Sequence, residues 1–420
     1  MRRILRRLAQ ERGQAIILFL IITSVTLVIG VITIDFGLWF SERRGAQKDA
    51  DLSALAAAQE LLPIVTLDDP NANAIQLAAN DRATEYANLN DVTDPANILL
   101  PSLADSQAWT ACWSDEGDTS RIIDTYPLDI KHPTRGLFGK IFSIADQSNL
   151  GAHARACVGS VISMENIMPI GVPIKNPDIS DVRELCWAPD NDGDGAPEPL
   201  YGKRCDLSVT DKDSGEAGWL SLDNSSPLPN PPTDICSAHA GGLSDLTAEI
   251  RQGGANTTCY VAPAGFRIED CTSSMNWCAF SQTGAHLNQI MGAFNTLFST
   301  EGSCNVDSDP YDDFEGALEL ESGTPGTESA FYRKICDSPR LVTLIIIDNF
   351  NSKANPQIPI RAFATFFVEG CVADGVEYPK CDPHGNIGHF NLYGRFVNIL
   401  AEGAVGRIVD WSPKRIILTE

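Results

Sequence analysis

Basic residues are scarce in this 420-residue chain, in which 31 lysines and arginines stand against 55 acidic residues, for a formal net charge of −24. The first twelve residues contain five of the arginines and one acidic residue, so the remainder is more acidic still. An acidic surface repels a phosphate backbone, and nucleic-acid binding is therefore disfavoured.

The signatures of common enzyme classes are also missing from the sequence. It contains no HExxH, GxSxG, P-loop or dinucleotide-binding glycine motif. Cys381 and His389 in "CDPHGNIGH" suggest a thiol–imidazole pair, but a disulfide-bonded cysteine is no nucleophile. We predict that the protein is not an enzyme, with a hydrolase as the weakest alternative.

Cysteine is absent before residue 112, although the chain contains twelve. An even number confined to one side of an apolar segment predicts disulfides in an oxidising compartment. Zinc is the rival explanation, with "CDPHGNIGH" as the nearest approach to a ligand spacing. Pairing neighbours in order would close six local loops, from Cys112–Cys157 through Cys371–Cys381, but the sequence leaves the connectivity open. The candidate disulfide cysteines are Cys112, Cys157, Cys186, Cys205, Cys236, Cys259, Cys271, Cys278, Cys304, Cys336, Cys371 and Cys381.

Charged residues are absent from Ala15 to Ile34, a run of 20 residues that is long enough to cross a membrane as a helix. A secretory signal has a shorter apolar region and a small-residue cleavage pattern, which this run does not match. More basic residues precede the span than follow it, so the positive-inside rule places the N-terminus inside. We expect a single-pass protein of the cytoplasmic membrane, with its ectodomain in the periplasm or at the cell surface.

The helical pattern continues beyond the span as "RRGAQKDADLSALAAAQELL", which is rich in strong helix formers and ends before Pro63. One nearly continuous helix is therefore predicted. Its narrow, alanine-lined apolar stripe would pack on a partner helix or on the chain's own globular domain. The expected stripe consists of Leu52, Leu55, Ala56, Gln59 and Leu62.

The order "RGQA", apolar span, "DFG" and "RR..Q..AD..ALAAAQEL" resembles the N-terminal segment of TadE/TadG-like proteins, which assemble Flp (tight-adherence) pili in bacterial envelopes. Processed pilins carry glutamate five residues after the cleaved glycine, where this chain has Leu18. The resemblance is therefore to the anchored TadG-like branch, and it implies pilus-assembly or envelope proteins as partners. The matching positions are Arg12, Gly13, Gln14, Ala15, Asp35, Gly37, Arg43, Arg44, Gln47, Asp49, Ala50, Asp51 and Ala56–Ala58.

Beyond the anchor, alternating patterns predict more strands than helices. We expect a helix at 71–90, two strands around a short helix near 137–144, and an amphipathic helix at 287–298. "IMPIGVPI" (167–174) resembles the proline-rich hinge of TadG-like proteins and is expected to be an extended connector. Further strands are expected at 341–350, 360–372, 389–402 and 415–418. The predicted fold is α+β, with a transmembrane helix continuing into an extramembrane helix and then a strand-rich, disulfide-stapled ectodomain.

An acidic loop, "CWAPDNDGDGAPEPLYGKRC", resembles the first half of an EF-hand calcium loop. Alternate carboxylates converge on one ion when the chain curls, and Gly195 supplies the sharp turn. The twelfth position is Tyr201 rather than glutamate, so a plain acidic turn stays an alternative. The candidate Ca²⁺ ligands are Asp190, Asp192, Asp194 and Glu198.

By residue range the chain divides into five parts. These are a cytoplasmic basic tail (1–12), a TadE/TadG-like anchor and juxtamembrane helix (13–62, span 15–34), a membrane-proximal α+β region (63–170), an acidic Pro/Gly-rich loop region (171–232) and a strand-rich C-terminal region (233–420). The predicted function is that of a structural or assembly component of a Flp-type pilus system. The alternative is a membrane-anchored adhesin or calcium-dependent binding module outside any pilus system.

Overall fold

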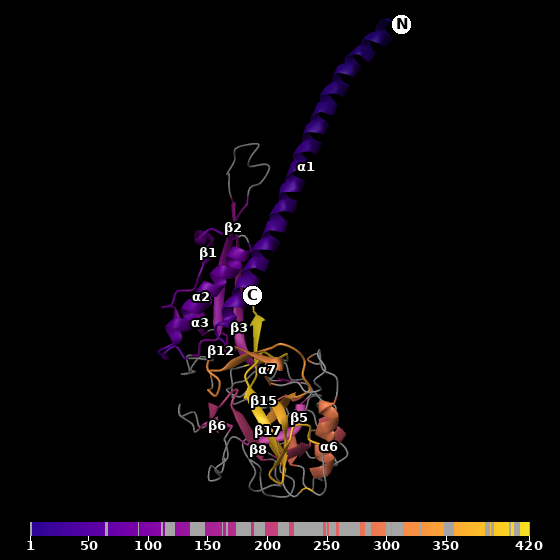
Figure 1. Ribbon diagram of the computed structural model, residues 1–420. Helices are drawn as coiled ribbons and strands as arrows, with labels where there is room; N and C mark the ends of the chain where they lie inside the picture. Colours follow the sequence, from indigo (N-terminus) through magenta and orange to yellow (C-terminus); the bar gives the residue numbers. More distant parts are fainter. Residues whose placement is uncertain are drawn as a thin grey trace.

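Figure 1 shows the computed structural model of the chain, in which one long helix projects from a strand-rich body. The structure describes residues 2–63, 66–90, 92–110, 112–113, 122–134, 148–161, 163–164, 167–173, 186–188, 198–208, 218–221, 247–248, 250–251, 258–259, 278–281, 287–299, 304, 314–327, 329–347, 357–382, 387, 390–402, 405–406 and 412–419.

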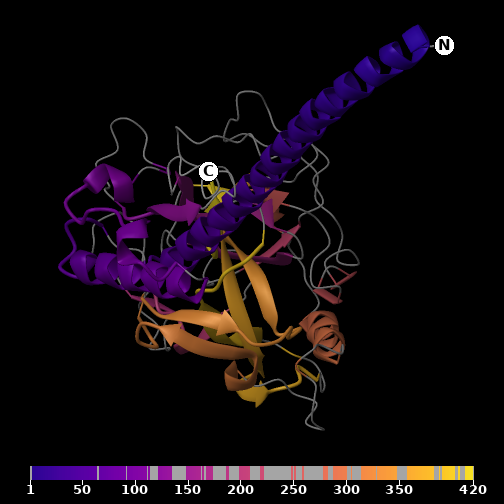
Figure 2. The ribbon, with the colours of Figure 1, turned by 90° about the horizontal axis from the view of Figure 1, so that it is seen from above.

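Helix α1 runs without interruption from Arg2 to Gln59, which confirms the prediction of one continuous helix. Its 58 residues correspond to about 87 Å at the usual helical rise. Seen from above, the helix crosses over the body and projects well beyond it (Figure 2). The helix ends just before Pro63, which lacks the backbone N–H that would extend it.

The part of the body nearest α1 is a five-stranded sheet in the order β1-β2-β3-β18, with β19 also pairing with β3. Its centre is a long antiparallel hairpin whose register runs from Thr125↔Cys157 to Thr134↔Ser148. The two strands expected around residues 137–144 are confirmed, and the short helix expected there lies outside the described residues. The strands are β1 (Ile98–Leu99), β2 (Thr125–Thr134), β3 (Ser148–Val161), β18 (Val405–Gly406) and β19 (Lys414–Leu418).

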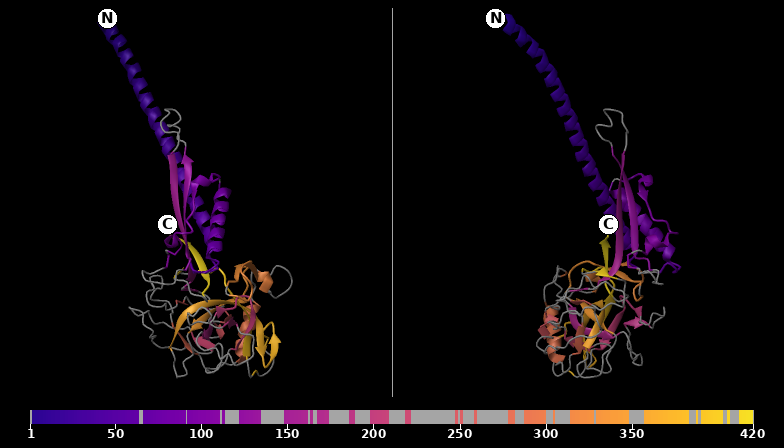
Figure 3. Two further views of the ribbon diagram at one scale, coloured as in Figure 1. Left: turned by 90° about the vertical axis from the view of Figure 1, so that its left-hand side faces the viewer. Right: turned by 180° about the vertical axis from the view of Figure 1, so that it is seen from behind.

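Two helices pack with this sheet and enclose the smaller of two hydrophobic cores. The last third of α1 and helix α2 (Ala72–Leu89) contribute mainly alanines, and the strands contribute Tyr126, Leu128 and Ile130. The helix expected at 71–90 is therefore confirmed. The short elements η1 (Pro95–Asn97) and α3 (Ser106–Trp109) connect α2 to β2, and buried Trp109 closes one end of the core. Figure 3 shows the α1–α2 pair on the hairpin in side view.

The rest of the body is built on an eight-stranded sheet in the order β11-β9-β5-β14-β15-β17-β8, with β16 on β15. Because β11 pairs with both β9 and β15, the strands β5, β14, β15, β11 and β9 close into a ring. The strands are β5 (Ile167–Pro173), β8 (Arg204–Ser208), β9 (Gly218–Ser221), β11 (Cys278–Ser281), β14 (Leu341–Ile347), β15 (Gln357–Ala373), β16 (Val376–Tyr378) and β17 (Phe390–Val397).

The larger core is formed by this sheet and by helix α6 (Leu287–Phe298), which covers it. The predicted apolar face of α6 is buried from Ile290 onward. Phe294 of α6 stacks with Phe390 of β17 at 6.3 Å between ring centroids. The strands predicted in the C-terminal third are confirmed as β14, β15, β17 and β19. Smaller elements are β4 (Ser163–Met164), β6 (Trp187–Ala188), β7 (Glu198–Pro199), β10 (Thr258–Cys259), α7 (Phe314–Ala317), β12 (Leu318–Ser322) and β13 (Phe331–Lys334).

The prediction for "IMPIGVPI" as a connector is wrong in one respect. The segment is extended, but its residues 167–173 form β5, a strand inside the sheet that runs parallel to β14 and antiparallel to β9. Ile167, Ile170 and Val172 are essentially inaccessible to solvent, and such continuous burial is typical of a strand covered on both faces. Two prolines in seven residues hide this role from the sequence, because proline disfavours central strands.

Four disulfides lie within the described residues, and they are Cys112–Cys157, Cys186–Cys205, Cys304–Cys336 and Cys371–Cys381. Each joins cysteines that are neighbours in sequence order, as the ordered pairing predicts. No cysteine of the described part is free. The body is therefore stapled by local crosslinks, which fits the expected oxidising compartment.

Disulfide removal should destabilise the fold according to the size of the loop that each bond closes. The Cys112→Ser/Cys157→Ser variant opens a 45-residue separation and is expected to lose about 4 kcal/mol of unfolding free energy. The Cys371→Ser/Cys381→Ser variant opens a 10-residue separation and should lose about 3 kcal/mol. Guanidinium unfolding of both variants checks this, and an equal or inverted order would contradict the loop-length explanation.

Candidate functional site

The first part of α1 exposes a continuous apolar surface. Most large side chains from Ile16 to Phe40 are exposed, and Phe19 and Leu27 are 68% and 65% exposed. Within the described residues, one helix is long and apolar enough to cross a membrane, and its most apolar window has a mean hydropathy of 2.8 with no buried residue. Exposed apolar surface on this scale is unfavourable in water and favourable in lipid.

An aromatic and basic group follows the apolar surface. The rings of Trp39 and Phe40 lie edge to face at 5.3 Å, and the guanidinium of Arg43 is 5.8 Å from the Trp39 ring centroid. Tryptophan and arginine at the end of an apolar span are typical of the membrane–water boundary. The group therefore marks where α1 leaves the apolar environment.

Burial begins at Ala46, where α1 meets the body. Ala46, Ala50, Ala54 and Ala57 are completely buried, which shows that the helix packs on its own domain rather than on a partner helix. Small side chains let the helix axis approach the sheet and α2 closely, because no long side chain intervenes. We call the buried surface of residues 46–62 the seat of α1.

The stripe predicted for the seat is wrong in part. Leu52 is 38% exposed and Gln59 is exposed, whereas Ala56 and Leu62 are buried and Leu55 is half-buried. The buried face is centred on the alanines and on Ser53 instead. The predicted stripe was alanine-lined, as the buried face is, but it was placed on the side of Leu52 and Gln59, because spacing along the helix does not show which side contacts the body.

Polar contacts at the start of the seat set the position of α1 along the hairpin. The amide of Gln47 donates from Nε2 to Asp51 Oδ1 and to the backbone oxygen of His153, both at 2.8 Å. His153 also contacts Asp129 on β2, at 2.8 Å between Nδ1 and Oδ1. The helix is thereby hydrogen-bonded to the middle of β3.

The core around the seat also contains buried polar groups. The hydroxyl of Tyr126 donates to Asn80 Oδ1 of α2 at 2.9 Å, and burial raises the pKa of this tyrosine far above its ordinary value. Among the described residues, Ser53 Oγ and Gln76 Nε2 are buried without a hydrogen-bond partner. Each such atom costs stability, so the alanine-lined interface is held chiefly by close packing.

The comparison with protein families identifies this helix. The model of the Tad family, described as "Putative Flp pilus-assembly TadE/G-like", matches residues 13–60. These residues are a TadE/G-like segment. The match does not distinguish the TadE branch from the TadG branch. No curated protein and no solved structure matches the chain.

The TadE/G-like segment covers two parts of α1 that differ in their surroundings. It starts just before the apolar span and ends one residue beyond α1, so it includes both the exposed anchor and the buried seat. The similarity to pilus-assembly proteins therefore covers one apolar helix that is long enough to cross a membrane, and the contact of this helix with the body. The described residues after this segment form the two sheets of the body.

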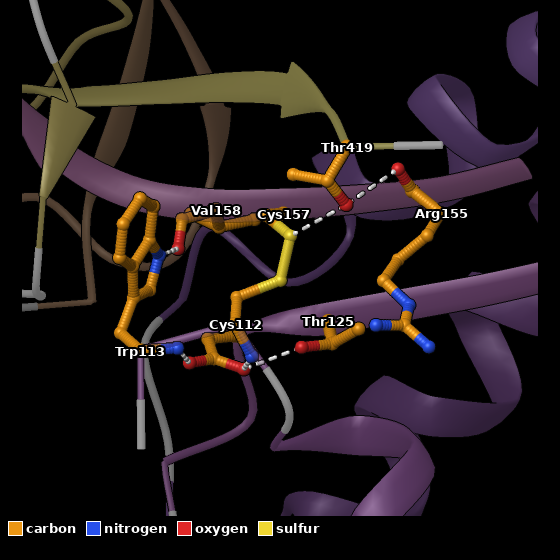
Figure 4. The surroundings of a disulfide bond; sticks show 8 residues. Cys112, Trp113, Thr125, Arg155, Cys157, Val158 and Thr419 are labelled. Carbon is orange, nitrogen blue, oxygen red and sulfur yellow. Dashed lines mark hydrogen bonds between the residues drawn. A yellow bond between two sulfur atoms is a disulfide. The ribbon is translucent and has the colours of Figure 1, made fainter. Parts of the chain in front are cut away.

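A disulfide corner supports the sheet on which the TadE/G-like segment sits (Figure 4). Cys112 precedes β2 in the chain and bonds to Cys157 of β3, with 6.0 Å between the Cα atoms. The indole Nε1 of Trp113 donates to the Val158 oxygen at 2.9 Å, and Thr419 N donates to the Arg155 oxygen at 2.9 Å. The corner thus joins the loop before β2, the central strand and the C-terminal strand.

Asp124 is the buried polar centre of this corner and was not anticipated from the sequence. It is 4% exposed and accepts hydrogen bonds from Thr125 Oγ1 at 2.6 Å and from the backbone N–H groups of Trp113 and Cys112 at 3.1 and 3.4 Å. Burial raises the pKa of Asp124, and the hydrogen bonds oppose that rise only in part. A single aspartate before a strand carries no sequence signal that would reveal this.

The raised pKa of Asp124 predicts a pH-dependent stability. Its stabilising contribution is fully present below the ordinary aspartate pKa and is lost as pH rises through the folded-state value, because the folded protein binds the proton more tightly. The stability of the wild type relative to Asp124→Asn should therefore fall with rising pH in the acidic range. Denaturant unfolding at several pH values measures this, and a difference that is independent of pH would contradict it.

Of the four candidate calcium ligands, only the backbone of Glu198 lies within the described residues. Asp190, Asp192 and Asp194 lie outside the described residues, as does the side chain of Glu198, whose backbone belongs to β7. The ends of this acidic loop are held together by the β6–β7 pairing and by the Cys186–Cys205 disulfide. Within the described residues, no group of three or more histidine, cysteine or acidic side chains could hold a metal ion.

An arginine–glutamate network on the larger sheet was also missed by sequence reasoning. Glu369 accepts from Arg395 Nε at 2.7 Å and lies 3.2 Å from Arg204 Nε, while Arg204 Nη2 reaches Glu377 at 2.9 Å. These residues come from β15, β17, β8 and β16, so the network fastens four strands. Their spacing along the chain has no pattern, and folding alone brings them together.

Proposed function

We propose that the chain is a structural or assembly component of a Flp-type, tight-adherence pilus system, of the anchored TadG-like kind. The observation that carries the proposal is the match of residues 13–60, which cover the anchor and the seat of one helix. The helix holds a disulfide-stapled body at the membrane. That body contacts pilus-assembly or envelope proteins.

The proposed orientation places the N-terminus in the cytoplasm and the body in the periplasm or at the cell surface. Five arginines precede the span, and the positive-inside rule keeps such a cluster on the cytoplasmic side. Four disulfides in the described part of the body support an oxidising location for it.

The experiment for the proposed function is deletion of the gene in its own host, followed by counts of surface pili and of attached cells. Loss of pili or of attachment, restored by the wild-type gene, is expected. Restoration should fail with a chain lacking residues 13–62, because the body then has no anchor. Normal pili and normal attachment after deletion would contradict the proposal.

A calcium-dependent surface adhesin remains the second candidate function, because the acidic loop at residues 189–197 has its ends closed by a strand pair and a disulfide. Because the two ends of the loop are held together, the loop has fewer conformations, and less conformational entropy is lost when its carboxylates gather around one ion. In this alternative, the body binds a surface or partner outside any pilus system.

Calcium is expected to raise the melting temperature of the full chain, and the Asp192→Ala/Asp194→Ala variant should abolish the rise. Two of the proposed ligands are then missing, and ligand binding stabilises only the state that binds. Asp211→Ala, in a neighbouring acidic stretch, is the matched control and should keep the wild-type response. An unchanged wild-type melting temperature at millimolar calcium would exclude the site.

A further inference from the structure

The β2–β3 hairpin extends toward the membrane end of α1. Figures 1 and 3 show its two strands running alongside the helix and ending beyond the rest of the body. Its membrane-side end consists of residues 131–134 of β2 and 148–150 of β3, which pair with one another without a break. Strand β1 pairs with β2 no further than Ile130, so the end projects beyond its neighbour.

The hydrogen bond between Gln47 and His153 gives the height of this end relative to α1. From His153 to Ser148, five residues of strand cover about 17 Å. The same distance along α1 corresponds to about eleven residues of helix, which leads from Gln47 back to the neighbourhood of Phe36. The hairpin end therefore lies level with the last residues of the apolar span and with the aromatic group at Trp39.

The α1 helix stands free of the body over the same height. Residues 36–44 are exposed except for half-buried Trp39, and the seat begins only at Ala46. The helix and the hairpin are thus separate at this height. If α1 spans a bilayer, the end of the hairpin lies at the surface of the same bilayer.

The hairpin end also carries a basic residue. Lys131 is the first residue of this end, and it places a cationic side chain near the height of the aromatic group at Trp39. Basic side chains beside a membrane are attracted to anionic lipid headgroups.

We propose that the end of the β2–β3 hairpin is a second membrane contact, which binds the lipid headgroups of the bilayer that α1 spans. The proposal rests on the membrane anchoring described above. A body held by one helix can tilt and rotate about it, whereas two contacts restrict its tilt. The hairpin therefore fixes the orientation in which the body faces its protein partners.

Fluorescence quenching in lipid nanodiscs tests the contact with the full chain. The Thr134→Cys and Ser148→Cys variants each carry an environment-sensitive fluorophore on the introduced thiol, and the bilayer carries lipids with a headgroup nitroxide. Leu38→Cys reports on the anchor, and Ile335→Cys, which is on the body at a site 54% exposed, is the matched control. Unmodified protein checks the background labelling.

Quenching at Thr134 and Ser148 is expected to equal that at Leu38 and to exceed that at Ile335 several-fold. Quenching at Leu38 combined with the Ile335 level at both hairpin positions would overturn the second contact and leave the anchor intact. Absence of quenching at Leu38 as well would overturn the anchor and the second contact together.

Discussion

The Val25→Arg/Leu27→Arg variant is expected to leave the membrane fraction almost completely. Both side chains are exposed near the middle of the span, where each arginine costs about 2.5–3.5 kcal/mol of insertion free energy. Together the two changes cost about 5–7 kcal/mol, which moves a stably inserted helix toward the uninserted state. Carbonate extraction followed by immunoblotting of pellet and supernatant measures the distribution.

A matched control separates insertion from general damage to the protein. Leu77 and Leu89 are 51% and 71% exposed on α2, so Leu77→Arg/Leu89→Arg adds the same charge outside the span. This control should stay in the membrane fraction like the wild type. If the doubly substituted span also stayed there, α1 would not be the membrane anchor.

The Ala54→Glu variant is expected to release α1 from its seat, whereas Leu52→Glu should be tolerated. Ala54 is completely buried among α2 and the sheet, so its replacement places an uncompensated charge in the core and costs at least about 3 kcal/mol. Leu52 lies on the same turn but is 38% exposed, and its replacement should change the unfolding free energy by about 0.5 kcal/mol or less.

Guanidinium unfolding and tryptic digestion together measure this difference. Release of the seat should lower the unfolding midpoint and accelerate cleavage after Lys48, because proteases require locally unfolded backbone. Equal effects of the two variants would contradict a buried face that is centred on Ala54 and leaves Leu52 exposed.

Several elements follow from local sequence alone. The uncharged run and the helix formers after it predict α1, since length and propensity decide whether a helix spans and continues. The apolar periodicity at 287–298 predicts α6, and β-branched and aromatic runs predict β14, β15 and β17. Ordered pairing of the cysteines agrees with all four disulfides in the described residues.

Other features depend on contacts between distant residues and were not predictable in this way. Residues 414–418 lie at the end of the chain, yet β19 pairs with β3 in the first sheet, so the C-terminal strand returns to the anchor side of the body. The prolines of β5 suggested a connector, but pairing with β14 and β9 overrides that local preference. Asp124 and the Arg204–Glu369–Arg395 network likewise acquire partners only on folding.

The sequence by itself therefore determined that this protein has an N-terminal helix long and apolar enough to cross a membrane, which continues beyond the apolar span, a TadE/G-like segment and a disulfide-stapled, strand-rich body. These features depend on composition, period and spacing within short segments. Only the tertiary structure decided which face of α1 is buried, that this face is centred on Ala50, Ala54 and Ala57 rather than on Leu52, and that the β2–β3 hairpin reaches the height of the span's end. The physical reason is that helix position and strand height are set by close packing and by single hydrogen bonds such as Gln47 to His153, which join residues far apart in the chain.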